Sequence, residues 1–150
     1  MVSRTVLLDA GPLGLATNPN RSPSNMACTR WLQELLAGGV HVLVPEIADY
    51  EVRRELLRAK KERGVAKLDA LAGSLGYLPL TTAAVRKAAE CWAEARQQGR
   101  QTASDQSLDA DVLLAGQALT LGGEVVIATT NVGHLSRFVA AEEWHKIRVT

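Results

Sequence analysis

The sequence predicts an α/β protein, a three-layer α/β/α sandwich in which helices cover both faces of a central parallel sheet. Short apolar runs of strand length alternate with longer segments of helical periodicity along the whole chain. Strands separated by helices are typically parallel and adjacent in one sheet. The chain has 150 residues, of which 47% are hydrophobic, enough for one continuous core. We therefore expect a single domain over residues 1–150.

The first half of the chain shows clear signals for the starts and ends of helices. Ser22-Pro23 has the chemistry of a helix start, and Gly38-Gly39 ends the helical pattern that follows. Pro45 stands at the favoured first turn of the next helix. The expected elements are a strand at 5–9, a helix at about 25–37, a strand at 41–44, a helix from 45 to about 62 and another at about 64–73.

The second half continues the alternation. Gly99 and the pair Gly122-Gly123 each end a helical pattern, and a polar loop is expected at 100–107. The expected elements are a short strand at 77–80, a helix at 82–98, a helix at about 109–121, a strand at 125–128, a short turn or helix at 133–140 and a final strand at 146–149.

Four polar side chains stand beside apolar elements and form a candidate site. Asp9 and Asn131 each follow a strand directly, so they are expected at the carboxyl edge of the sheet, where ligands bind in parallel α/β proteins. Glu51 lies about two turns into the helix after the second strand, and Asp111 lies in the first turn of its helix. If the four converge, they make a site for a hard divalent cation that prefers oxygen ligands.

Each acid also has a purely structural interpretation. Asp9 could cap a turn at Gly11-Pro12, and Asp109 and Asp111 could complement the dipole of their helix. For Asp109 we prefer that interpretation. An acid beside a buried strand costs desolvation energy unless it is paired, which favours a functional role for Asp9. Asp111 adjoins an apolar helix face, so a site role is at least as well supported.

Positive charge is concentrated in one region, although the net charge of the chain is only +1. Seven of the 17 Lys and Arg residues lie between Arg53 and Lys67. This run could contact phosphates, or it could be a solvated helix face whose interleaved glutamates are salt-bridge partners. The candidate substrate-binding residues are Arg53, Arg54 and Arg58.

Cysteine usage and hydropathy favour a soluble cytoplasmic protein. Cys28 and Cys91 lie inside helical patterns with no Cys-x-x-Cys or Cys/His cluster, so neither a disulfide framework nor a zinc site is indicated. The longest apolar stretches are far shorter than a membrane span, and the N-terminus leads directly into a strand.

The order of these motifs resembles the PIN-domain nucleases, and among them the small VapC-like ribonuclease toxins. The resemblance spans Val6 to about Arg148. It rests on the acid after the first strand, on Pro45-Glu-Ile-Ala-Asp-Tyr-Glu51-Val-Arg-Arg, on Asp111-Val-Leu-Leu-Ala-Gly-Gln-Ala and on a strand ending in Thr-x-Asn-x-x-His. It implies a PIN-like fold, Mg²⁺ or Mn²⁺ bound by three acids, and a fourth catalytic position. The matching residues are Asp9, Glu51 and Asp111 as metal ligands and Asn131 at the fourth position.

The resemblance also implies an activity and partners. It implies a metal-dependent endoribonuclease that hydrolyses phosphodiester bonds of single-stranded RNA, with a cognate antitoxin protein and a homodimeric state. The chain departs from the family at Ala10 and Gly11, where Ser or Thr is frequent, and at Asn131 and His134, where acids are often found. These departures favour one metal ion over two.

Two other functions stay open at this stage. In a metal-dependent phosphatase on a doubly wound sheet Asp9 would be the nucleophile, but such enzymes usually have a second Asp two residues later, where this chain has Gly11. The chain could also be a non-catalytic PIN-like module that binds RNA or a protein partner.

Overall fold

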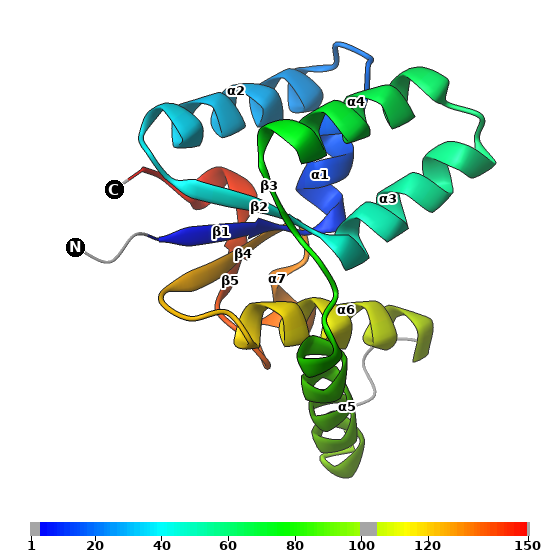
Figure 1. Cartoon of the computed structure of the whole chain (residues 1–150), viewed down its shortest axis with the longest axis vertical. Coiled ribbons are helices and arrows are strands. Elements are labelled where there is room, and N and C mark those ends of the chain that lie inside the picture. Colours follow the sequence, from blue (N-terminus) through cyan, green and yellow to red (C-terminus); the bar gives the residue numbers. More distant parts are fainter. Residues whose placement is uncertain (1–3, 100–104, 150) are drawn as a thin grey trace.

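The computed structural model describes residues 4–99 and 105–149, and these form one parallel sheet covered by helices (Figure 1). The sheet has five strands in the order β3-β2-β1-β4-β5, and every neighbouring pair is parallel. The predicted α/β sandwich with a central parallel sheet is confirmed. The strands are β1 (Thr5–Leu8), β2 (His41–Pro45), β3 (Gly76–Leu78), β4 (Val125–Thr129) and β5 (Ala141–Glu143).

Helices cover both faces of the sheet. Helix α5 packs on α6 and points away from the sheet (Figure 1). Among the described helices, none is both long and apolar enough to cross a lipid bilayer. The helices are α1 (Ala10–Thr17), α2 (Pro23–Ala37), α3 (Glu46–Arg58), α4 (Glu62–Ser74), α5 (Thr82–Gln97), α6 (Asp105–Leu119) and α7 (Val132–Leu135), with a 3₁₀ turn η1 at Trp144–Lys146.

The core has two main parts because successive strand residues point to opposite faces of the sheet. Val6 and Leu8 of β1 pack with residues of α1, α2 and α4, whereas Leu7 packs with Leu114 of α6 and Leu135 of α7. All five side chains are at most 1% exposed. The near-continuous apolar runs of the strands follow from this burial on both faces.

Helix α1 was missed by the sequence-based prediction. Gly11 and Pro12 favoured a turn after Asp9, yet both lie inside this helix. Pro12 is tolerated because it stands in the first turn, where backbone N–H groups have no intrahelical acceptor. Asp9 is the N-cap, and its Oδ1 accepts a hydrogen bond from the Ala10 N–H at 2.8 Å.

The final strand was predicted in the wrong place. Residues 146–149 do not join the sheet, and β5 at Ala141–Glu143 pairs with β4 instead. The apolar pattern of the segment reflects a different contact. Ile147 is 1% exposed, and its carbonyl oxygen accepts a hydrogen bond from the Trp31 indole N–H at 2.8 Å.

Helix α6 begins earlier than predicted. Of the loop expected at 100–107, residues 100–104 lie outside the described residues, and the helix starts at Asp105. Asp109 is therefore an exposed residue within the helix and not its N-cap, and Asp111 lies in the second turn and not the first.

The strand order places a topological switch between β1 and β4. The chain adds β2 and then β3 on one side of β1, and then returns to add β4 on the other side. In open parallel sheets the loops that leave the two strands at such a switch diverge and form a crevice at the carboxyl edge. Asp9 follows β1 and Asn131 follows β4, so both lie at this crevice.

Gln117 of α6 holds the start of α3 against the end of β3. Its side chain is 1% exposed. Its Oε1 accepts a hydrogen bond from the Ile47 N–H at 3.3 Å, and its Nε2 donates to the carbonyl oxygens of Leu78 at 2.8 Å and Pro79 at 3.1 Å. Because α3 carries Glu51, this buried amide also positions the candidate site.

We expect Gln117→Leu to lower the free energy of unfolding by about 2–4 kcal/mol, because it leaves one backbone N–H and two carbonyl groups without their partner. Urea denaturation followed by circular dichroism measures the change. The control is Gln97→Leu at the exposed end of α5, which should change stability by less than about 0.5 kcal/mol. Equal stability of the two variants would contradict the role of Gln117.

Candidate active site

Asp9 is held rigidly at the carboxyl end of β1. Leu8 pairs with Ala128 in the sheet, and the Asp9 N–H continues this pairing by donating to the Ala128 carbonyl oxygen at 3.0 Å. One carboxylate oxygen caps α1, and the other, Oδ2, accepts a hydrogen bond from the Thr129 hydroxyl at 2.7 Å. The structural and functional interpretations of Asp9 are therefore compatible, because a single rigid carboxylate can cap α1 and still face the crevice.

Thr129 is a site residue that the sequence analysis did not identify. Its side chain is fully buried at the end of β4. The hydroxyl donates to Asp9 Oδ2 and accepts a hydrogen bond from the Asn131 N–H at 2.9 Å. The sequence feature that could have identified Thr129 is a polar residue at the end of a buried strand. The hydroxyl that the family resemblance places just after the first acid is supplied here by the neighbouring strand.

Gly11 is required by the residue that follows Thr129. A Cβ atom at Gly11 would lie 2.6 Å from Thr130 Oγ1, closer than real Cβ contacts allow. A larger side chain two residues after Asp9 would therefore displace Thr130. A second aspartate at this position, as in the phosphatase considered above, would require the Thr130 side chain to move.

Asp111 of α6 carries the most unusual oxygen of the site. Its Oδ2 is buried, and within the described residues it has no hydrogen-bond partner. His134 Nδ1 lies 3.6 Å from this oxygen, beyond hydrogen-bond distance. Burial, followed by the negative charge of Asp9, raises the pKa of Asp111 to about 6, while His134 and Arg137 oppose the shift. A buried carboxylate oxygen without a donor is the kind of group that a cation would stabilise.

Glu51 of α3 completes a set of three acids that influence one another. Burial, together with the negative charges of Asp9 and Asp111, raises its pKa to about 7, while the charge of Arg54 opposes the shift. The three carboxylates come from the start of α1, from α3 and from α6, and each lies near enough to affect the ionisation of another. The structure thus brings together the three acids that the sequence selected.

Asn131 lies at the rim of this set. It is exposed and precedes α7 without forming a side-chain cap. Its Nδ2 lies 3.2 Å from His134 Nδ1, and His134 in turn faces Asp111. The predicted fourth residue is thus linked to the acids through the Thr129 hydroxyl and the His134 ring.

The donor set fits a hard divalent cation, although the carboxylates do not form a closed cage. Within residues 4–99 and 105–149, no three acidic, His or Cys side chains converge closely enough to ligate one ion. Mg²⁺ retains several waters when it binds proteins, so it does not require three carboxylates in contact. The raised pKa values of Glu51 and Asp111 show that burial and mutual repulsion disfavour the ionised carboxylates, and within the described residues the Asp111 Oδ2 has no hydrogen-bond partner that would offset this.

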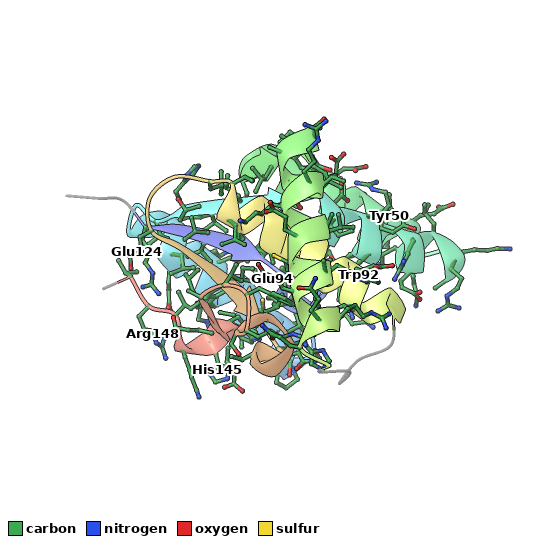
Figure 2. All side chains as sticks on the ribbon, turned by 90° about the horizontal axis from the view of Figure 1, so that it is seen from below. Tyr50, Trp92, Glu94, Glu124, His145 and Arg148 are labelled. Atoms are coloured by element: carbon green, nitrogen blue, oxygen red, sulfur yellow. The ribbon has the colours of Figure 1, made fainter. Side chains whose placement is uncertain are left out.

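The three candidate arginines have different surroundings. Arg53 binds Asp49 at 3.1 Å and Asp69 at 2.7 Å, so its charge is already paired. Arg58 pairs with Glu55 at 2.8 Å on the exposed end of α3. Arg54 lies over the ring of Tyr50, which is exposed on the surface of α3 (Figure 2).

Arg54 is the arginine of α3 that lies at the acids. Together with Glu51, Tyr50 and Leu113 it lines an open cavity of about 490 Å³ between α3 and α6. Its charge also lowers the pKa of Glu51, which shows that the two groups are close. A phosphate next to the acids would therefore meet Arg54.

Solved structures of VapBC complexes share this architecture. A chain of DNA-bound VapBC from Salmonella typhimurium is 20% identical, with a TM-score of 0.69 over 96% of this chain and 99% of that one. VapBC-1 from nontypeable Haemophilus influenzae matches with 17% identity and a TM-score of 0.70 over 95% and 99%. VapBC2 from Rickettsia felis, bound to a promoter DNA fragment, matches with 18% identity and 0.68 over 92% and 97%. The chain has a PIN-domain fold.

The PIN fold confirms the resemblance that the order of the motifs indicated. No protein-family model matches the sequence, and comparison with curated proteins finds no significant match. At 17–20% identity the structural matches establish the fold, and the chemistry rests on the side chains described above.

We expect Thr129→Val to weaken Mn²⁺ binding by about tenfold, because Asp9 and the Asn131 backbone lose the hydroxyl that orients them. Thr129→Ser keeps the hydroxyl and should retain the affinity within about threefold. Isothermal titration calorimetry with Mn²⁺ measures both variants. Equal affinity of the Val and Ser variants would show that the hydroxyl does not position the site.

In the metal-free protein we expect Glu51→Gln to be stabilising at pH 8. The folded pKa of about 7 lies above the unfolded value of 4.5, so the folded state binds more protons between these values and loses stability as the pH rises. The gain should be on the order of 1–2 kcal/mol at pH 8, because Glu51 is partly exposed and screened, and should vanish near pH 4.5. Urea denaturation in EDTA at both pH values measures it; a gain that does not depend on pH would contradict the shift.

Proposed function

We propose that the chain is a metal-dependent endoribonuclease that hydrolyses phosphodiester bonds of single-stranded RNA. The observation that carries this proposal is the buried, unpartnered Oδ2 of Asp111, which lies with Asp9 and Glu51 at the switch of a PIN-like sheet. These three acids would hold Mg²⁺ or Mn²⁺, and Asn131 would occupy the fourth catalytic position.

A bound ion would polarise the phosphodiester and lower the pKa of an attacking water. The chain's own residues supply the rest of the chemistry. A carboxylate of the cluster would orient that water and accept its proton. The water oxygen bonds to phosphorus, one P–O bond breaks, and the leaving oxygen takes up a proton. Arg54 stands where it can neutralise the adjacent phosphate.

The shape of the site supports a single-stranded substrate. Asp9, Glu51 and Asp111 are only partly buried, and the cavity beside them is open to solvent. A flexible strand can bring one phosphate into such an open crevice. The family resemblance supports RNA as the nucleic acid.

The similar structures support a two-component system. The matching chains belong to VapBC complexes, two of them bound to DNA. We propose by analogy that a small DNA-binding antitoxin is the partner of this chain, and, from the family resemblance, that the chain forms a homodimer.

We expect Asp9→Asn and Asp111→Asn each to lower the rate of Mn²⁺-dependent cleavage of a single-stranded RNA at least about a hundredfold without unfolding the protein. Glu94→Gln on α5, an exposed acid that does not line the cavity at Glu51 and Arg54, is the control and should retain activity within about threefold. Gel analysis of a labelled RNA measures the rates. Full activity of Asp111→Asn would remove Asp111 from the proposed site.

The same experiment separates the nuclease from a non-catalytic PIN-like module that binds RNA or a protein partner. The absence of a closed cage of ligands among the described residues is the observation that keeps this alternative in view. A wild-type chain that binds RNA with equal affinity with and without Mn²⁺ and never cleaves it would support the module and contradict the nuclease.

A further inference from the structure

A second cavity, of about 520 Å³, lies beside the candidate active site and is strongly basic. It is formed by the segment after α1, by α2 and by α4. Four of its lining residues are positively charged, and in the described part of the chain its lining includes no acid. These four residues, which we call the basic pocket, are Arg21, Arg30, Arg63 and Lys67.

The charges of the basic pocket are not neutralised by the protein. Within the described ranges none of its four residues forms an ion pair. Arg53 and Arg58, from the same basic run of sequence, are both paired with acids. All four side chains are exposed. Like charges gathered around one hollow repel each other and raise the local concentration of anions.

The basic pocket adjoins a cavity that reaches the candidate active site. A third cavity, of about 360 Å³, shares the residues Asn18, Pro19 and Asn20 with the basic pocket and includes Glu51 in its lining. Lys61 also lines this connecting cavity. Glu55 lines it as well, so residues 18–20 separate the basic pocket from a cavity that holds Glu51, Glu55 and Lys61.

We propose that the basic pocket is a phosphate subsite for the backbone of the RNA strand whose scissile phosphate lies at Asp9, Glu51 and Asp111. The subsite rests on the proposed function, because it binds a distant part of the same substrate. It gives the enzyme a binding site of several nucleotides.

The lining chemistry favours RNA over an acidic protein segment. Guanidinium groups donate in pairs to phosphate oxygens, and the side-chain amides of Asn20 and Gln33 add further donors. Met26 is the one large apolar side chain in the lining. Protein partners anchor mainly through buried apolar and aromatic side chains, for which this pocket offers little surface.

The test compares two variants that each lose one Arg and one Lys from a single exposed helix. Arg63→Gln/Lys67→Gln removes half of the basic pocket, and Arg86→Gln/Lys87→Gln on α5 is the matched control. Binding of a fluorescent 12-nucleotide single-stranded RNA is measured by anisotropy in EDTA at several salt concentrations. Thermal unfolding followed by circular dichroism confirms that both variants remain folded.

We expect the pocket variant to bind about tenfold more weakly at low salt, and the slope of log K against log salt to flatten by about 1.4, because two phosphate contacts are lost. The control should bind within about twofold of the wild type. Equal affinity and slope of the two variants would overturn the subsite.

Two further measurements, of poly-glutamate binding and of RNA cleavage, distinguish the other possible roles of the pocket. If a poly-glutamate peptide binds the wild type through Arg63 and Lys67 while the RNA does not, the pocket belongs to an acidic protein and the proposal is wrong. Cleavage in Mn²⁺ is measured separately. A wild type that binds RNA through the pocket without cleaving it would remove the nuclease assignment but would retain the subsite as an RNA-binding site.

Discussion

The candidate site depends on the parallel pairing of β1 with β4. Because Leu8 lies opposite Ala128, the next residues along the two strands, Asp9 and Thr129, meet at the carboxyl edge and form a 2.7 Å hydrogen bond. A shift of one residue in this pairing would turn every side chain of the strand to the other face. The buried apolar residues on both faces of β1 prevent that shift, so core packing fixes the geometry of a polar site.

The site opposes the stability that the core provides. Glu51 and Asp111 are held where burial and neighbouring negative charge disfavour their ionised forms, and the pKa of each is raised as a result. Proteins keep such arrangements where a cation or substrate offsets the repulsion. Rigid contacts hold the acids in place despite this loss of stability. Gln117 makes one such contact, since it ties the helix of Glu51 to the helix of Asp111.

Features set by periodicity could be predicted from the sequence, and features set by tertiary contacts could not. Four of the five strands and the three acids follow from apolar runs and their polar ends. Helix α1 was hidden by Gly and Pro residues that the first turn tolerates, and the burial of Ile147 against α2 mimicked a strand. The role of Thr129 depends on which strand lies beside β1. The local sequence does not determine the order of the strands in the sheet, so this role could not be predicted.

The basic residues between Arg53 and Lys67 show the same difference between what composition indicates and what tertiary contacts determine. By composition, Arg53, Arg58, Arg63 and Lys67 are equivalent sources of positive charge. In the folded chain, Arg53 and Arg58 are paired with acids, either within α3 or across to Asp69 of α4, whereas Arg63 and Lys67 face α2 across a hollow lined by polar and basic residues. Pairing removes most of the attraction that a cation has for a distant phosphate, because the neighbouring carboxylate cancels its field. The packing of α4 against α1 and α3, and not the number of basic residues, therefore decides which cations stay available for a polyanion.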